Sequence, residues 1–428
     1  MTNSADPETP PVMFSRRAYC AREQAISFLM QQAVENSQVI SLAAGLVDFA
    51  TLPVAEARSA AADLLAADGL ARQALQYGTT PGADDVRQSI LRHFARQEHI
   101  DPAKSGLDIE RVVLTTGSQQ LLSLICEVLL DPYDICLVAD PTYFVFIGNL
   151  NGVAARPFGV GADEEGMQPD ALERTLQRLD ADGQLDRVKL IYLVSYYDNP
   201  RGVSLSAERR AEIVAIARRW SRNQRILLLE DAAYRELRYD GPELPSVWSC
   251  DASSEYVIYT QTFSKSFSPG LRVGFGILPR DLVRPVSDRK GNEDFGSANF
   301  NQRLIARILE SNHYERHVAD VRAGYTVKRD AMLAAADEFF SDIPGVTWLR
   351  PSGGLYVWMS LPEHIATGFE SPLFAEATRR CGVMYVPGEL SYAAGRPNNQ
   401  MRLSFGVQTP DGIREGMRRL SQAVRGVL

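Results

Sequence analysis

The chain has 428 residues, a formal net charge of −8 at pH 7, 45% hydrophobic residues and 23% charged residues. This length exceeds the size at which one core keeps growing, so we expect one large and one smaller domain. The composition is that of an ordinary globular protein, and the scattered positive charges exclude an evident surface for nucleic acid or membrane.

The cysteines and the N-terminus favour a soluble protein of the reducing cytoplasm. The five cysteines form neither a CxxC motif nor a Cys/His cluster, and they are Cys20, Cys126, Cys136, Cys250 and Cys381. They predict no disulfide framework and no metal site. Residues 1–13 are polar and Pro-rich, without the apolar core of a signal peptide, and no stretch reaches the ~18 apolar residues of a membrane span.

Before residue 112 the sequence predicts helices and two loops of small residues. Residues 17–36 and the alanine-rich stretch 55–67 are expected to be helical. Between them lies a short apolar segment in which Gly45 allows the backbone to approach a ligand closely. Tyr77 lies on a Gly/Thr/Pro loop, QYGTTPG, which precedes an amphipathic helix.

From residue 112 onward, apolar strands alternate with helices. The expected strands are Val112–Thr115, Ile135–Ala139, Val188–Val194, a strand ending at Asp231, Tyr256–Thr260 and Val273–Leu278, with helices at Ser118–Leu130 and Ala207–Trp220. This alternation predicts a largely parallel sheet covered on both faces. The polar loops follow the carboxyl ends of the strands, where ligands bind in open α/β sheets.

A second alternating region follows helices expected between about residues 298 and 340. It contains Gly353–Leu361, a helix at Pro372–Cys381, the segment GVMYVP, the strand MRLSFG at Met401–Gly406 and a last helix from about Pro410. This region predicts a smaller α/β domain, to which the N-terminal segment could return.

Several loop residues have both a functional and a structural interpretation. Ser118 in GSQQ begins a helix, where it is either a simple cap or part of an anion site. Asp231 and Glu230 leave a buried strand and need partners, either a salt bridge or, less commonly, a positively charged heterocycle nitrogen. Tyr234 could lie beside whatever Asp231 holds.

Three basic residues also carry alternatives. Lys265 lies in TFSKSFSPGLR between two apolar strands, so it is either a site residue or a solvated lysine on a surface loop. Arg272, if buried, needs a carboxylate or a phosphate. Because successive side chains of a strand point to opposite faces, Arg402 faces either the site or solvent. Together, these residues fit pyridoxal 5′-phosphate bound as a Schiff base on lysine.

With these motifs in order over nearly the whole chain from about residue 20, the sequence resembles the fold-type I, class I/II pyridoxal-phosphate aminotransferases. It is most similar to the branch of 2-aminoadipate and kynurenine aminotransferases. The resemblance implies a large domain with a mostly parallel seven-stranded sheet flanked by helices, plus a smaller α/β domain. The expected division is 1–45, an N-terminal segment packing on the small domain, 46–325, the large cofactor-binding domain, and 326–428, the small domain.

The resemblance also implies a role for each motif residue. Lys265 would carry the cofactor and act as the base, and Asp231 would face the pyridine nitrogen. The phosphate would be held by Ser118, Gln119, Thr262, Ser264 and Arg272. The ring would be held by Tyr143, by stacking, and by Asn199 and Tyr234, through its hydroxyl oxygen. Arg402 would bind the substrate α-carboxylate near Gly45, and Tyr77 would enter the neighbouring subunit's site in a homodimer.

Two positions depart from the family pattern. Thr262 replaces the usual Gly or Ser three residues before the lysine and keeps a hydroxyl. Arg201 follows the Asn-Pro motif in YYDNPRG, where Thr or Ser is usual. Arg201 is either a solvated loop residue or a residue that changes the substrate profile.

The expected reaction is ping-pong transfer of an amino group between an L-amino acid and a 2-oxo acid. The alternatives are a lyase or an oxidase with the same cofactor, and a non-catalytic or regulatory domain, for which no helix-turn-helix pattern or basic extension is seen. Substrate side-chain selectivity is expected from the loop after Gly45 and from a set of N-terminal and loop residues: Phe14, Tyr19, Arg22, Phe28 and Tyr197.

Overall fold

A computed structural model describes residues 12–20, 38–102, 106–394 and 397–428. Its centre is an eight-stranded sheet in the order β2-β9-β8-β7-β6-β3-β4-β5. The strands are β2 (Val112–Thr115), β3 (Ile135–Asp140), β4 (Arg156–Asp163), β5 (Gly166–Met167), β6 (Val188–Val194), β7 (Leu227–Asp231), β8 (Val257–Thr262) and β9 (Gly274–Ile277). Six strands run in one direction, and β9 and β5 run against them.

The expectation of seven strands was wrong, because the sheet has one additional strand at its edge. After β4 the chain turns at Glu164 and Glu165, and two residues pair back antiparallel as β5, of which the first, Gly166, has a φ of 93° that suits a glycine. A two-residue strand is too short to leave a periodic pattern in the sequence. β4 itself, RPFGVGAD, carries a proline and two glycines, which are unfavourable in strands, so the sequence pattern did not predict it either.

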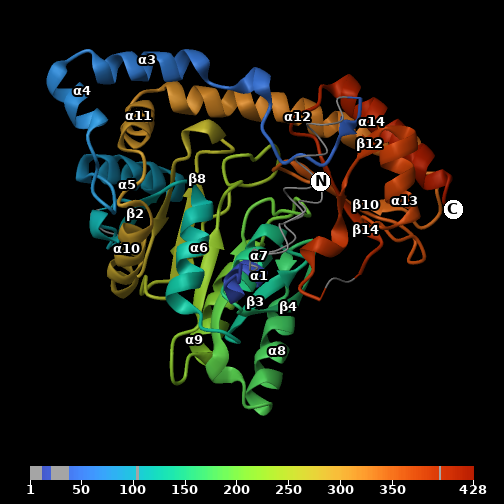
Figure 1. The fold of residues 1–428 in the computed structure, drawn as a ribbon, viewed down its shortest axis with the longest axis horizontal. Coiled ribbons are helices and arrows are strands. Elements are labelled where there is room, and N and C mark those ends of the chain that lie inside the picture. The colour runs from blue at the N-terminus through green and yellow to red at the C-terminus, as the bar shows by residue number, and fades with distance from the viewer. Residues whose placement is uncertain (1–11, 21–37, 103–105, 395–396) are drawn as a thin grey trace.

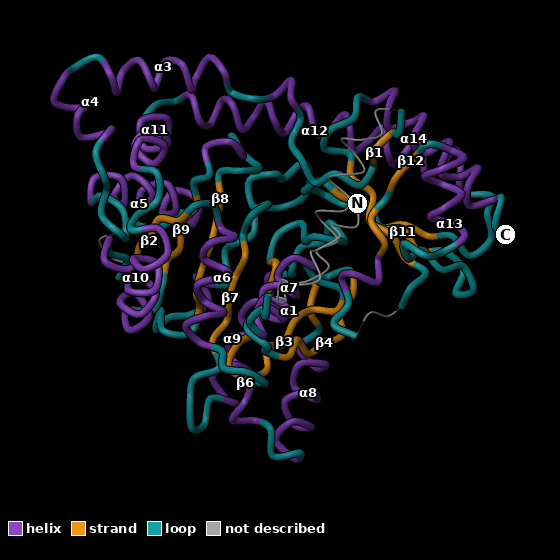
Figure 2. The backbone as a smooth tube through the Cα atoms, in the orientation of Figure 1, coloured by secondary structure: helices purple, strands orange, loops and turns teal. Residues whose placement is uncertain are grey.

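Apolar side chains alternate between the two faces of this sheet and form two cores. Helices α6, α7 and α10 contribute to the core on one face, and α5, α8 and α9 contribute to the core on the other. Figure 2 shows these helices in purple around the orange strands of the sheet. The bounds are α5 (Asp84–Glu98), α6 (Ser118–Leu129), α7 (Phe144–Gly152), α8 (Pro169–Ala181), α9 (Ala207–Trp220) and α10 (Arg280–Asp294). The predicted sheet covered on both faces is confirmed.

A second, four-stranded sheet has the order β10-β11-β14-β13. Its strands are β10 (Thr347–Trp348), β11 (Tyr356–Ser360), β13 (Val386–Pro387) and β14 (Gln400–Ser404), and all its pairs are antiparallel. Beside it, β1 (Ile40–Ser41) pairs parallel with β12 (Val383–Met384). The segment before Gly45 therefore does return to the C-terminal region, although the three domain boundaries stay predictions.

The remaining helices connect and cover these sheets. They are α1 (Arg16–Cys20), α3 (Val54–Leu65), α4 (Asp68–Leu75), α11 (Asn299–Leu309), α12 (His313–Phe340), α13 (Pro372–Ala375), a π-helical segment at Glu376–Cys381 and α14 (Pro410–Arg425). In Figure 1, α12 runs along the top of the molecule from α11 to α14 and so spans both sheets.

Two predicted helices are seen only in part as expected. Of the helix expected at 17–36, the structure describes only α1, and residues 21–37 lie outside the described part. The helix expected at Pro372–Cys381 continues beyond α13 with π-helical hydrogen bonding. Among the described residues, no helix is long and apolar enough to cross a membrane. All five cysteines are free thiols.

Candidate active site

A cavity of about 420 Å³ lies at the carboxyl ends of the central strands. It is lined by predicted site residues and four others: Gly45, Leu46, Ser118, Gln119, Tyr143, Val194, Asn199, Asp231, Ala233, Tyr234, Thr262, Ser264, Lys265, Pro269 and Arg272. Apart from Tyr77 and Arg402, every residue predicted for the site thus lines one cavity. The parallel strands bring them together because their carboxyl ends meet at the same edge of the sheet.

Lys265 lies just after β8 and is half-buried, so the alternative of a solvated surface lysine is wrong. Its Nζ donates a 2.7 Å hydrogen bond to the carbonyl oxygen of Gly45. Burial lowers the pKa of Lys265, and the positive charges of Arg402 and Arg272 lower it further. A lysine in this environment gives up its proton more readily than a solvated one and can act as a nucleophile or base.

Asp231 and Glu230, adjacent in β7, point to opposite faces of the sheet. Glu230 accepts hydrogen bonds from the Ser195 hydroxyl and from the backbone N–H groups of Val247 and Trp248, so its role is structural. Arg210 lies 3.7 Å from it.

Asp231 faces the cavity and is 4% exposed. It accepts hydrogen bonds from the Tyr192 hydroxyl at 3.0 Å and the Ala233 N–H at 3.1 Å, and forms no ion pair within the described residues. Burial raises its pKa to about 6, and the two hydrogen bonds oppose that rise. A cationic ring nitrogen is the partner that such a carboxylate can still accept.

The start of α6 and Arg272 form a cradle of hydrogen-bond donors. Gly117 precedes α6 with a φ of 72°, and no side chain caps the helix, so Ser118 is not a simple cap. A Cβ at Gly117 would lie 2.6 Å from Nη2 of Arg272, and one at Gly274 would lie 2.6 Å from the Ser118 nitrogen. Glycine at both positions therefore allows the guanidinium to lie against the open helix start, which suits a phosphate.

Arg272 is exposed and lines the cavity, and its backbone is in the αL region (φ 52°). Its guanidinium donates to the Ser264 hydroxyl and the Thr116 carbonyl at 3.3 Å and meets no carboxylate in the described parts of the chain. The Thr262 and Ser264 hydroxyls lie 2.9 Å apart at the same end of the cavity. This end is rich in donors and free of acids.

Arg402 lies on β14 and is 3% exposed, so the alternative of a solvated face is wrong. Its guanidinium donates to Oδ1 of Asn199 and to the Ala43 carbonyl oxygen, both at 2.8 Å. Its Nε is buried and has no hydrogen-bond partner among the residues that the structure describes. A buried arginine bonded only to neutral acceptors, with an unused N–H, suits an incoming carboxylate.

Residues 37–420 match the family model described as Aminotransferase class I and II. This chain belongs to the class I and II aminotransferases. A curated relative, the aromatic-amino-acid aminotransferase 1 of Thermococcus litoralis, is 34% identical, with 96% of this chain and 94% of the relative covered.

Two solved aminotransferases share the whole fold. The kynurenine aminotransferase of Pyrococcus horikoshii, in complex with PMP, superposes with a TM-score of 0.88 at 33% identity, covering 97% of each chain. The alpha-aminoadipate aminotransferase of Thermus thermophilus, complexed with N-(5′-phosphopyridoxyl)-L-leucine, gives 0.83 at 32% identity and the same coverage. The protein is thus a transaminase with pyridoxal 5′-phosphate as its cofactor, and the lyase, oxidase and regulatory alternatives are not favoured.

Two predicted residues of this aminotransferase lie outside the cavity lining. Arg402 is in contact with the lining residue Asn199. Tyr77 is 79% exposed and packs edge-on against Phe295, with ring centroids 5.7 Å apart. Within a single chain Tyr77 does not reach the cavity lining.

The idea that Arg201 is a solvated loop residue was wrong. Arg201 is 4% exposed and donates from Nε and Nη2 to one carboxylate oxygen of Asp198, at 3.0 and 2.7 Å. Its Nη1 donates to the Asp163 carbonyl oxygen at 2.8 Å. The side chain bonds to Asp198 of the same loop and to Asp163 of β4, and it does not line the cavity. Arg201 is therefore a structural residue of the aminotransferase.

Sequence reasoning missed two buried tyrosines, Tyr192, which bonds Asp231, and Tyr356, whose hydroxyl lies 3.1 Å from that of Tyr234. Strand alternation could have identified Tyr192 as inward-facing, but nothing in the sequence pairs Tyr356 with Tyr234. Of the residues proposed for selectivity, Tyr197 is buried and does not line the cavity, Phe14 and Tyr19 are exposed, and Arg22 and Phe28 lie outside the described residues.

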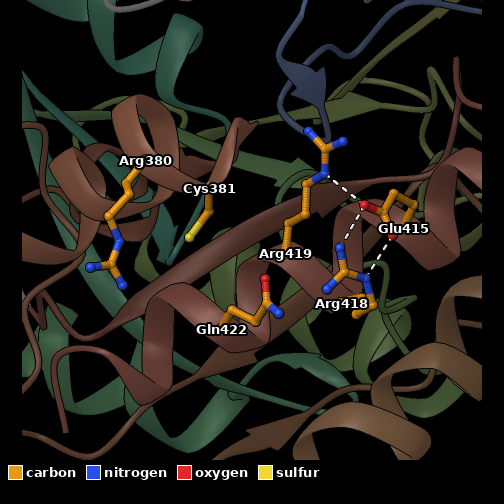
Figure 3. Close-up of a pocket in the computed structure, with 6 residues that line it drawn as sticks. All are labelled: Arg380, Cys381, Glu415, Arg418, Arg419 and Gln422. Atoms are coloured by element: carbon orange, nitrogen blue, oxygen red, sulfur yellow. Dashed lines mark hydrogen bonds and ion pairs between the residues drawn. The ribbon is translucent and has the colours of Figure 1, made fainter.

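A second hollow, of about 670 Å³, lies between α14 and the π-helical segment (Figure 3). It is lined by Arg380, Cys381, Glu415, Arg418, Arg419 and Gln422. Glu415 accepts hydrogen bonds from both Arg418 and Arg419, and Arg380 pairs with Glu376. Because these surface charges are paired, the hollow does not offer the uncompensated donors seen around Lys265.

Proposed function

We propose that the cavity around Lys265 is the active site, in which an amino group passes between an L-amino acid and a 2-oxo acid in two half-reactions. The observation that carries the proposal is the convergence on one cavity of a half-buried lysine, a buried aspartate with no ion pair among the described residues, and a cradle of hydrogen-bond donors. These features match the aldehyde, the ring nitrogen and the phosphate of the cofactor.

The residues divide by the part of the cofactor that they would hold. The phosphate would be held by Ser118, Gln119, Thr262, Ser264 and Arg272. The ring would be held by Tyr143 on its face, by Asp231 at its nitrogen, and by Asn199 and Tyr234 at its hydroxyl oxygen. Support comes from the open N-terminus of α6 and from the missing ion pairs of Arg272 and Asp231 within the described structure.

The catalytic steps of the chain are proton transfers. When bound, the cofactor supplies an electron sink beside the substrate Cα. Asp231 keeps a proton on the ring nitrogen, since its ionised form gains a cationic partner there. Lys265, with its lowered pKa, would remove the Cα proton and later return a proton.

Arg402 would bind the α-carboxylate of the substrate, since within the described parts of the chain its buried Nε has no partner and its other donors meet neutral acceptors. The substrate is then an α-amino acid in one half-reaction and a 2-oxo acid in the other. The named relatives act on aromatic amino acids, kynurenine and α-aminoadipate, and we propose the same broad class here.

A homodimer with shared sites is also proposed. Tyr77 is highly exposed on the loop before α5, and two exposed apolar residues lie near it: Leu75 at the end of α4 and Phe295 against its ring. Burial of this surface by a second copy would bring Tyr77 to the partner's cavity. The cytoplasmic location stays a prediction from the cysteine usage.

The decisive experiment is reconstitution with pyridoxal 5′-phosphate, followed by assays with amino acids and 2-oxo acids. The holoprotein should be yellow, borohydride should fix the cofactor to the peptide that contains Lys265, and the amino group should appear on the acceptor acid. Release of ammonia or peroxide in place of transfer would refute the transaminase assignment. A colourless protein that gains no absorbance would refute the cofactor site.

A further inference from the structure

Tyr356, the first residue of β11, connects the two sides of the active site. It is 1% exposed, and no sequence motif points to it. Its hydroxyl lies 3.1 Å from the hydroxyl of Tyr234, a residue of the cofactor side. Its ring lies under the guanidinium of Arg402, with Cζ 4.3 Å from the ring centroid.

Gly45 makes room for this tyrosine. A Cβ at Gly45 would lie 2.7 Å from Oη of Tyr356, closer than a carbon and an oxygen can approach without a shift. The carbonyl oxygen of Gly45 accepts the 2.7 Å hydrogen bond from Lys265. The Tyr356 hydroxyl is therefore held beside the segment that also contacts the catalytic lysine.

We propose that Tyr356 is a positioning residue that acts through both its hydroxyl and its ring. Its hydroxyl donates to the Tyr234 oxygen and so directs the Tyr234 proton toward the ring oxygen of the cofactor, while its ring holds the Arg402 guanidinium in the plane that meets the substrate carboxylate. The inference rests on the proposed function, because it uses the roles of Tyr234 and Arg402 given there.

The direction of the hydrogen bond follows from the single proton that each hydroxyl can donate. In the proposed function Tyr234 donates its proton to the ring oxygen of the cofactor. Its own oxygen can then only accept the 3.1 Å bond, so the Tyr356 hydroxyl is the donor.

The ring of Tyr356 completes the support of Arg402. Two N–H groups of the guanidinium are fixed by Asn199 and Ala43, and Nε has no partner among the described residues. A planar cation bonded on one edge can still tilt, and an aromatic ring at 4.3 Å restricts that tilt. Leucine at this position would keep the burial but lose both the hydroxyl and the π face.

The hydroxyl is tested with Tyr356→Phe by following the visible absorbance of the holoenzyme as a function of pH. A donor at the ring oxygen stabilises the deprotonated chromophore, so weakening Tyr234 as a donor should raise the titration midpoint by roughly 0.3 pH units. Tyr234→Phe should raise it further, and Tyr356→Phe added to Tyr234→Phe should change nothing more. An unchanged midpoint in Tyr356→Phe, or additive shifts in the double variant, would overturn the hydroxyl role.

The ring is tested by comparing Tyr356→Phe with Tyr356→Leu in steady-state kinetics. Tyr356→Phe should leave the KM for the amino acid close to that of the parent, whereas Tyr356→Leu should raise it roughly tenfold. The corresponding amine, which has no carboxylate, should show no such difference between the two variants. Equal KM values in the two variants, or an equal rise for the amine, would overturn the ring role.

Two measurements separate this inference from the proposed function and from simple unfolding. Thermal unfolding of each apoprotein identifies a variant that fails to fold, and Tyr356→Phe keeps the ring that fills the buried space. If the parent protein is yellow and transfers amino groups but its Tyr356→Phe variant titrates identically, only the role of Tyr356 fails. If the parent binds no cofactor, the proposed function fails first.

Discussion

Lys265 and Gly45 are 220 positions apart, yet the Lys265 Nζ donates a 2.7 Å hydrogen bond to the Gly45 carbonyl oxygen. Gly45 follows the short strand β1, which pairs with β12, whereas Lys265 follows β8 of the large sheet. Lys265, the proposed catalytic lysine, is thus contacted by a segment that pairs with the C-terminal region of the chain. Five predictions follow from this and related contacts.

Lys265→Ala should abolish covalent attachment of the cofactor and lower turnover by about 10³-fold or more, since both nucleophile and base are lost. Borohydride treatment followed by mass spectrometry should find no reduced adduct, while circular dichroism stays native. A variant that retains turnover would show that another group is the base. Lys189→Ala, on β6, serves as a lysine control.

Arg402→Ala should lower kcat/KM for amino acids by about 30-fold or more, because a buried charged hydrogen-bond donor for the carboxylate is lost. The effect should lie mainly in KM and should be small for the matching amines. Arg418→Ala, on α14 far from the cavity, is the control for loss of an arginine. A similar loss with acids and amines would argue against a carboxylate role.

Asp231→Asn should change the pH dependence of apoprotein stability. Burial raises the pKa of Asp231 to about 6 in the folded chain, so the folded state binds this proton more tightly than the unfolded chain does. The resulting stabilisation is complete below about pH 4 and is lost as the pH rises through about 6, a change of about 3 kcal/mol. Relative to Asp231→Asn, the parent apoprotein should therefore lose stability between these pH values.

Urea unfolding of both apoproteins at several pH values measures this difference, and parallel curves would contradict it. The holoenzyme should behave in the opposite way. A cationic ring nitrogen favours ionised Asp231, so Asp231→Asn should weaken cofactor binding, as measured by absorbance titration.

Arg201→Ala should destabilise the protein by about 3–5 kcal/mol, because Asp198 would be left as a buried carboxylate without its charged partner. The KM for the amino acid should change little, since Arg201 does not line the cavity. Adding Asp198→Asn should recover part of the lost stability in urea unfolding. A large rise in KM with native stability would instead mean that Arg201 acts on the substrate.

A mixture of two defective variants tests the proposed dimer. If Tyr77 serves the partner's cavity, a hybrid dimer of Lys265→Ala and Tyr77→Ala contains one site with both residues intact. Unfolding and refolding the two variants together should therefore restore activity above that of either alone. No recovery, in a sample shown by sedimentation to contain dimers, would place Tyr77 outside the partner's site.

Much of the site could be predicted locally, because each residue follows a buried strand at a loop that needs polar character. Asp231 at the end of an apolar strand and Lys265 between two apolar strands were found in this way, and the cavity contains both. Reasoning from one strand or loop at a time did not determine whether Arg272 and Arg201 are exposed. Exposure depends on what packs against a side chain: Arg201 is buried against the Asp198 carboxylate, whereas Arg272 is exposed at the cavity.

The sequence by itself determined the alternating α/β architecture, the order of the motifs and the residue types that suit the cofactor, because strand burial and loop chemistry leave local patterns. Only the tertiary structure decided that Arg402 is buried with a free Nε, that Arg201 pairs with Asp198, and that Tyr356 joins Tyr234 to Arg402. These contacts link residues on separate strands and loops. Their geometry depends on how the two sheets pack, which no local pattern records.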